Sequence, residues 1–164
     1  MMSHRDVYLG LDMSLSSAGI AAIAVEKGLP TLLIATRART NPKKRHGERL
    51  YQIASKMRAI SAEYGPFRQV IREQGFSRFA KATQAIFKSI GVSDIVFKDY
   101  DIEEYSPTAI KSTIAQYGKA SKDEVEENVR AILGLDEEYV FESDDASDAC
   151  AIILTHLIKN KLIF

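Results

Sequence analysis

The sequence lacks the features on which several protein classes depend. Its single cysteine, Cys150, excludes an internal disulfide framework and agrees with a reducing compartment. No apolar run approaches the ~20 residues of a membrane-spanning helix, and the first residues lack the apolar stretch of ~7 to 15 residues typical of a secretory signal. The 164 residues are too few for two large lobes. We therefore expect one domain over residues 1–164, in the cytoplasm.

Histidine is also scarce, and its distribution predicts no zinc site. His4, His46 and His156 have no metal-ligand spacing. Cys150 falls on the apolar side of the last predicted helix, so we assign it to the core. Neither zinc nor thiol chemistry is predicted.

The net charge of zero hides a strong asymmetry. Residues 37–58 carry eight Lys or Arg against one Glu, and residues 123–148 carry eleven Asp or Glu against one Arg. A basic segment of this kind is either a solvated helix face with its approach loop or a patch that contacts phosphates. If it contacts phosphates, the candidates are Arg37, Arg39, Lys43, Lys44 and Arg45.

Strand-like and helix-like apolar segments follow one another along the chain in an order that predicts an α/β arrangement. The chain is expected to open with an antiparallel three-stranded meander. The gaps between its strands are turn-like, and proline, glycine and capping residues mark most of the later boundaries. The expected strands cover residues 6–12, 18–25, 30–37 and 68–73, with a fifth within 95–105. The expected helices cover residues 47–62, 77–90, about 107–117 and 121–133, with a last one from 143 or 144.

The helix expected over residues 77–90 has more apolar surface than a helix with one buried face needs. Its apolar positions are Phe79, Ala80, Ala82, Ala85, Ile86, Phe87 and Ile90. We expect the additional apolar face to contact a second subunit.

Two carboxylates are expected at the ends of buried strands. Asp12 closes the first strand, and small residues follow it and leave space at the carboxylate. Taken alone, Asp12 is more typical of a residue that begins a turn by capping local N–H groups. Glu73 ends the fourth strand, where a buried charge needs a partner, and a metal ion, Arg72 or a nearby lysine could be that partner.

Two further carboxylates begin the last helix. Asp145 and Asp148 are three residues apart, so they lie on one face of the helix and repel each other. The helix dipole offsets part of this repulsion, and Asp144 or Asp145 could also cap the helix. Asp148 lies one turn further in and is less easily explained as a cap. A divalent cation would stabilise the pair.

Together, the carboxylates of Asp12, Glu73, Asp145 and Asp148 predict a metal-dependent nuclease site. Oxygen ligands favour Mg²⁺ or Mn²⁺ over zinc. Two such ions ~3.5 to 4 Å apart can activate a water and stabilise the leaving oxygen of a phosphate ester.

Several further residues are candidates for holding a polyanion. Lys111, Lys119 and Lys122 lie in or near the first turns of predicted helices, where a lysine can oppose the helix dipole. Contact with phosphate would explain them, although ordinary exposed lysines would look the same. Phe76 could stack on a base or pack in the core.

These segments together resemble the RuvC family of Holliday junction resolvases. The matching stretches, in family order, are LGLDMSLSSAGIAAI, RTNPKKRHGERLYQIA, VIREQGF, EYSPTAIKSTIAQYGKASKDEVEENVRAILGL and DDASDACAIILTH. The resemblance implies a ribonuclease H-like fold, whose mixed five-stranded sheet adds two parallel strands to the meander and is flanked by helices. It also implies a homodimer that nicks four-way DNA junctions symmetrically with two Mg²⁺ ions, or with Mn²⁺.

Carried over by position, the resemblance assigns the metal carboxylates to Asp12, Glu73, Asp145 and Asp148. It places Lys111 and Lys122 in the catalytic site near the scissile phosphate and Phe76 near the junction.

The sequence departs from the family after its first aspartate, where Met13-Ser14 replaces Pro-Gly. This departure suggests a phage-encoded member that acts in the cytoplasm of an infected bacterium on a broader range of branched DNA. Two alternatives stay open, namely a ribonuclease H-like nuclease for RNA–DNA hybrids and a non-catalytic dimer that binds branched DNA. An ATP-binding domain of the actin type is disfavoured because no second Gly-rich loop is present.

Overall fold

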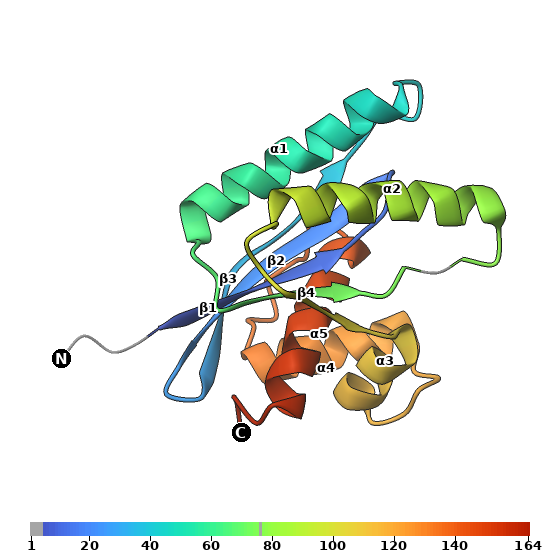
Figure 1. The fold of residues 1–164 in the computed structure, drawn as a ribbon. Coiled ribbons are helices and arrows are strands. Elements are labelled where there is room, and N and C mark those ends of the chain that lie inside the picture. Colours follow the sequence, from blue (N-terminus) through green and yellow to red (C-terminus); the bar gives the residue numbers. More distant parts are fainter. Residues whose placement is uncertain (1–4, 76) are drawn as a thin grey trace.

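A five-stranded mixed sheet forms the centre of the molecule in the computed structural model, which describes residues 5–75 and 77–164 (Figure 1). The strand order is β3-β2-β1-β4-β5; the first three strands are antiparallel, and β4 and β5 run parallel to β1. The predicted mixed sheet is therefore confirmed. The strands are β1 (Asp6–Asp12), β2 (Ser17–Glu26), β3 (Leu29–Arg39), β4 (Gln69–Glu73) and β5 (Ile102–Tyr105).

The helices cover both faces of this sheet. One face carries α1 (His46–Tyr64) and α2 (Ala80–Val96), and the other carries α3 (Pro107–Ala115), α4 (Lys122–Leu133) and α5 (Asp144–Lys159) (Figure 1). Side chains alternate between the two faces along a strand. Tyr8 therefore packs in the hydrophobic cluster under α5, whereas Leu9 packs in the cluster under α1.

The predicted element order is confirmed, and one boundary differs appreciably. The second helix begins at Ala80 and continues to Val96, so the fifth strand is confined to Ile102–Tyr105. Phe97, which follows the helix, is buried and anchors this end of α2 in the core. No helix in the described part of the chain is long and apolar enough to cross a membrane.

Candidate active site

Two of the predicted carboxylates are brought together by neighbouring parallel strands. Leu11 of β1 lies opposite Arg72 of β4, and each is followed by the acidic residue that ends its strand. Because parallel strands end at the same edge of a sheet, Asp12 and Glu73 lie at one edge.

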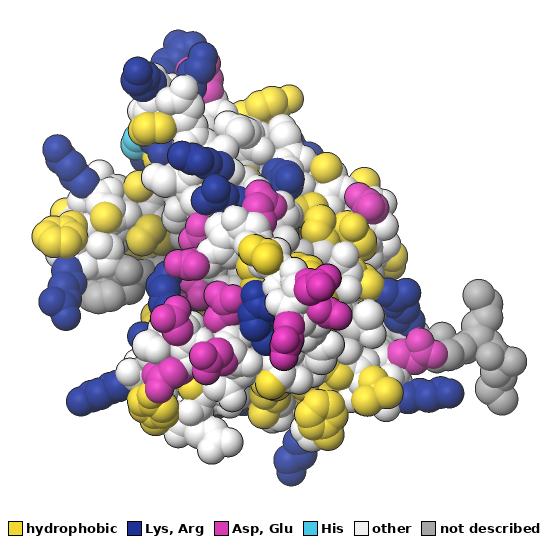
Figure 2. Space-filling model, turned by 180° about the vertical axis from the view of Figure 1, so that it is seen from behind, with side chains coloured by type: hydrophobic (Ala, Val, Ile, Leu, Met, Phe, Trp, Pro, Cys, Tyr) yellow, Lys and Arg dark blue, Asp and Glu magenta, His cyan; other side chains and the backbone are white. Residues whose placement is uncertain are grey.

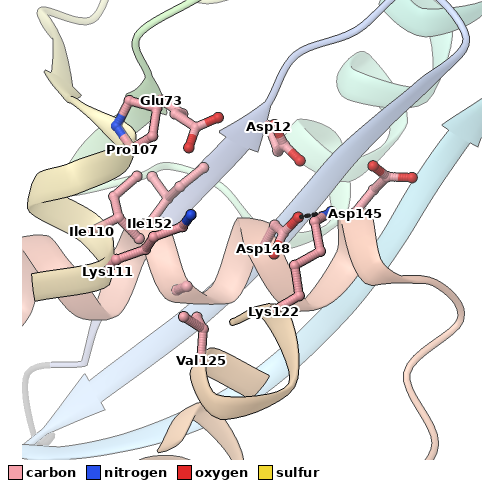
Figure 3. Close-up of a pocket in the computed structure, with 11 residues that line it drawn as sticks. Asp12, Glu73, Pro107, Ile110, Lys111, Lys122, Val125, Asp145, Asp148 and Ile152 are labelled. Carbon is pink, nitrogen blue, oxygen red and sulfur yellow. Dashed lines mark hydrogen bonds and ion pairs between the residues drawn. The ribbon is translucent and has the colours of Figure 1, made fainter. Parts of the chain in front are cut away.

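The other two carboxylates are placed by the close approach of α5 to the sheet. A Cβ atom on Gly19 would lie 2.0 Å from the carbonyl oxygen of Asp145, and one on Gly10 would lie 2.3 Å from that of Ala149. Only glycine permits this distance between backbones. The first turns of α5 therefore lie directly over the end of β1, and Asp145 and Asp148 face Asp12 (Figure 3).

All four carboxylates line one cavity of about 310 Å³. Oxygen atoms of Asp12, Asp145 and Asp148 all lie within 4.8 Å of one another, close enough to hold one metal ion. Glu73 lines the same cavity but is not part of this group of three (Figure 3). The structure thus brings the four predicted residues together, three of them tightly.

Burial and repulsion from neighbouring carboxylates make the charged forms of Asp12, Glu73 and Asp148 unfavourable. Burial, followed by the charges of Glu73, Asp148 and Asp145, raises the pKa of Asp12 to about 8. Burial and the charge of Asp148 raise the pKa of Glu73 to about 7. Burial also raises the pKa of Asp148 above its ordinary value, although Lys122 opposes the shift. A cation in the cavity would oppose these shifts, because it stabilises the charged carboxylates.

Arg72 does not neutralise Glu73. The Arg72 guanidinium points away from the cavity and forms ion pairs with Asp94 at 2.7 Å and with Glu104 at 3.2 Å. Adjacent residues of a strand face opposite sides of the sheet, which explains this separation. The geometry therefore excludes Arg72 as the partner of Glu73. A metal ion and the cavity lysines remain, since Lys111 and Lys122 line the cavity and oppose the rise in the pKa of Glu73.

Serines, rather than aspartates, cap the local backbone near the site. Ser143 caps α5 by accepting a hydrogen bond from a first-turn N–H group. The Ser14 hydroxyl accepts from the N–H of Ser17 at 3.0 Å and closes the loop after β1. Neither Asp145 nor Asp12 is needed as a cap, so both carboxylates can face the cavity.

Ser17 is a residue of the site that the sequence interpretation missed. Its hydroxyl donates a 2.6 Å hydrogen bond to Oδ2 of Asp145 and so orients that carboxylate. The two residues are 128 positions apart. Local spacing could not have linked them, and only the position of Ser17 at the start of β2, opposite the end of β1, was available as a signal.

Two of the three predicted lysines line the cavity. Lys111 and Lys122 reach it from α3 and α4, and the Lys122 ammonium lies 3.3 Å from Oδ2 of Asp148 (Figure 3). The charge of Asp148 raises the pKa of Lys122. Lys119 is exposed in the turn before α4 and does not line the cavity. Phe76 lies outside the described residues.

The predicted basic patch is exposed at the start of α1. Lys43, Lys44 and Arg45 are all exposed in the loop before this helix, and Arg39 is exposed at the end of β3, whereas Arg37 is partly buried. Figure 2 shows several Lys and Arg side chains at the top of this face and most of its Asp and Glu side chains across the middle, with further Lys and Arg side chains among them and around the edge. The acidic side chains are therefore more concentrated on this face than the basic ones.

Comparison with known proteins identifies the family. Residues 8–156 match the family model described as crossover junction endodeoxyribonuclease RuvC. The chain belongs to the RuvC family. A RuvC relative from Prochlorococcus marinus is 33% identical over 151 residues, which are 91% of this chain and 94% of the relative.

Solved structures agree with this assignment. T. thermophilus RuvC in complex with Holliday junction substrate superposes with a TM-score of 0.85 at 26% identity, over 96% of each chain. The yeast mitochondrial Holliday junction resolvase shares the fold at 10% identity, with a TM-score of 0.61 over 94% of this chain and 80% of that one. The predicted ribonuclease H-like fold of the RuvC type is therefore confirmed.

Proposed function

We propose that this RuvC family member hydrolyses phosphodiester bonds at four-way DNA junctions, using two Mg²⁺ ions that Mn²⁺ can replace. The observation that carries the proposal is the convergence of Asp12, Asp145 and Asp148 within 4.8 Å in one cavity. The fold comparison with T. thermophilus RuvC, which was solved in complex with Holliday junction substrate, supports the choice of DNA.

The donor set fits divalent magnesium or manganese. Its ligands are carboxylate oxygens, which these hard cations prefer. Burial raises the pKa values of Asp12 and Glu73, and a divalent cation beside these carboxylates would favour their charged forms. Bound ions would activate a water molecule and stabilise the leaving oxygen.

We assign roles to the surrounding residues from their positions. Asp12 lies between Glu73 on one side and the α5 carboxylates on the other, so it would help to hold both ions (Figure 3). Lys111 and Lys122 would attract and orient the scissile phosphate. Lys43, Lys44 and Arg45 would contact the backbone further along the DNA, as would Arg39, Arg37 and Lys119.

We also propose that the chain forms one nuclease domain and acts as a homodimer. Both hydrophobic clusters pack on the same sheet, which supports one domain. Phe87 and Ile95 of α2 are 55% and 67% exposed, and Phe79 before the helix is 74% exposed. A second subunit covering this surface would present two cavities to a symmetric junction and permit paired nicks.

The loop after β1 supports a substrate range that differs from that of other family members. Where the family has Pro-Gly, Met13 is buried in the core and Ser14 closes the loop through its hydroxyl. Because this change lies next to Asp12, we propose that the protein cleaves several kinds of branched DNA. We place this activity in the cytoplasm of a bacterium or of a phage-infected host cell.

Nicking assays with defined substrates test the proposal. Purified protein is incubated with a labelled four-way junction, a Y-fork, an RNA–DNA hybrid and a linear duplex, with and without Mg²⁺. We expect paired symmetric nicks in the junction and no cleavage of the duplex. Cleavage of the hybrid alone would instead support the alternative nuclease activity.

Substitution of the carboxylates tests the site itself. Asp12→Asn and Glu73→Gln should each abolish cleavage and leave junction binding intact or tighter, because each removes negative charge near phosphate. Asp101→Asn, at an exposed residue outside the cavity, should behave as wild type. Normal cleavage by either cavity variant would refute the assignment of that residue.

A further inference from the structure

A second cavity, of about 400 Å³, lies between the first turns of α1, the first half of α2 and the loop after β1. We refer to it as the α1–α2 groove. None of its lining residues is acidic, and its polar lining consists of Ser16, His46, Arg49, Lys81, Gln84 and Lys88. Such a lining suits an anion.

The basic side chains of the groove converge from two helices. Lys81 and Lys88 are two turns apart on α2, so they lie on the same face. The Lys88 ammonium lies 2.9 Å from Nδ1 of His46, at the first turn of α1. Because an ammonium can only donate, Nδ1 accepts this bond and Nε2 carries the ring proton, where it can donate to an anion. The positive end of the α1 dipole adds to the attraction.

No carboxylate among the described residues pairs with the positive charges of the groove. Within residues 5–75 and 77–164, Lys81, Lys88 and Arg49 form no ion pair with a carboxylate. Arg49 is buried, and its guanidinium donates to Thr40 Oγ1 at 2.9 Å and to Ser16 Oγ at 3.3 Å. Arg49 therefore fixes the loop that forms one wall of the groove, and its positive charge lies beside the groove.

The groove adjoins the carboxylate cavity. The loop after β1 separates the two, with Asp12 on the cavity side and Leu15 and Ser16 on the groove side. The next residue, Ser17, donates to Asp145. Figure 1 shows the first turns of α1 and α2 at the end of the molecule where β1 ends. A DNA strand with one phosphate at the cavity would bring further phosphates past this loop.

We propose that the α1–α2 groove binds a backbone phosphate of the cleaved DNA strand, a few nucleotides from the scissile phosphate. This inference rests on the proposed function and adds a subsite to it. Lys81, Lys88 and His46 contact the phosphate, and Arg49 positions the loop that joins the subsite to Asp12. Contacts of this kind fix the register of the strand without reading its sequence.

Binding of a labelled four-way junction in a chelator, measured at several salt concentrations, tests the groove. Lys81→Ala/Lys88→Ala should weaken binding and lower the slope of log affinity against log salt by about one for each phosphate that the variant no longer binds. The control is Lys98→Ala/Lys159→Ala, which removes two exposed lysines elsewhere and should keep the wild-type slope. Thermal melting verifies that both double variants are folded.

Junctions with single uncharged methylphosphonates locate the bound phosphate. One such substitution near the nick should weaken binding by wild type but not by Lys81→Ala/Lys88→Ala. The groove does not bind DNA if the variant keeps the wild-type salt slope and methylphosphonate profile. It also does not bind DNA if the variant self-associates less than wild type but binds the junction with the same affinity. Nicking of the same junction by wild type with Mg²⁺ tests the proposed function separately. If wild type cleaves the junction and the variant binds it as wild type does, the proposed groove subsite is refuted and the proposed function stands.

Discussion

The charge of Asp12 should lower the folding stability of the metal-free protein at alkaline pH. Burial and neighbouring carboxylates raise the pKa of Asp12 from 3.8 to about 8. A carboxyl group with a higher pKa in the folded state stabilises the fold below its unfolded pKa, and this contribution is lost as the pH rises through the folded pKa. For Asp12 the loss therefore occurs between about pH 4 and about pH 8.

We expect Asp12→Asn to raise the free energy of unfolding by about 2 to 3 kcal/mol in metal-free buffer at about pH 8.5. The difference between 3.8 and about 8, at about 1.4 kcal/mol per pKa unit, sets an upper limit of about 5 to 6 kcal/mol. The gain is smaller than this limit because water entering the cavity screens the charge.

Urea unfolding followed by circular dichroism, in a chelator at about pH 4 and about pH 8.5, measures this difference. The variant and wild type should be similarly stable at the lower pH, where Asp12 is neutral. Asp101→Asn, at an exposed residue, is the matched control. Added Mg²⁺ should narrow the gap because it binds the folded wild type. A wild type as stable as Asp12→Asn at the higher pH without metal would refute the reasoning.

Two further predictions concern the placement of the α5 carboxylates. Gly19→Ala should destabilise the protein by about 3 kcal/mol and raise the Mg²⁺ requirement for nicking, because its Cβ would lie 2.0 Å from the Asp145 carbonyl oxygen. Gly47→Ala, whose added Cβ atom would have no contact within 4 Å outside its own helix backbone, should not destabilise the protein. Ser17→Ala should raise the Mg²⁺ concentration for half-maximal nicking by about 10- to 100-fold, whereas Ser55→Ala, which loses only a bond within its own helix, should not. An unchanged Mg²⁺ dependence in the Ser17 variant would contradict its proposed orienting role.

The features of the fold that depend on local sequence could be predicted. Short apolar runs separated by turn-like residues identified the meander. The helices expected over about 107–117 and 121–133 are present as α3 and α4, and Ser106 and Ser121 cap their starts. Asp12 and Glu73 could be placed because each ends a strand, and parallel strands align their ends. These are properties of short segments, so the sequence pattern carries them.

The features that depend on contact between distant segments could not be predicted. The approach of α5 depends on Gly10 and Gly19, which in the sequence are only small residues in apolar strands. The bond between Ser17 and Asp145 follows from that approach. Arg49 belongs to the basic run in the sequence, yet it is buried and supports a loop. Only the tertiary structure distinguishes such a residue from a basic residue on the surface.

The position of Lys122 is explained by the charge of the cavity rather than by stability. As the first residue of α4 it opposes the helix dipole, which is unfavourable. Its ion pair with Asp148 is largely exposed on the lysine side, and such pairs contribute little. However, its ammonium lowers the pKa values of Asp12, Glu73 and Asp148 relative to what burial alone would give. Lys122 therefore favours the ionised form of these carboxylates, which is the form that can bind a divalent cation. This effect explains a lysine at a position where it would otherwise weaken the helix.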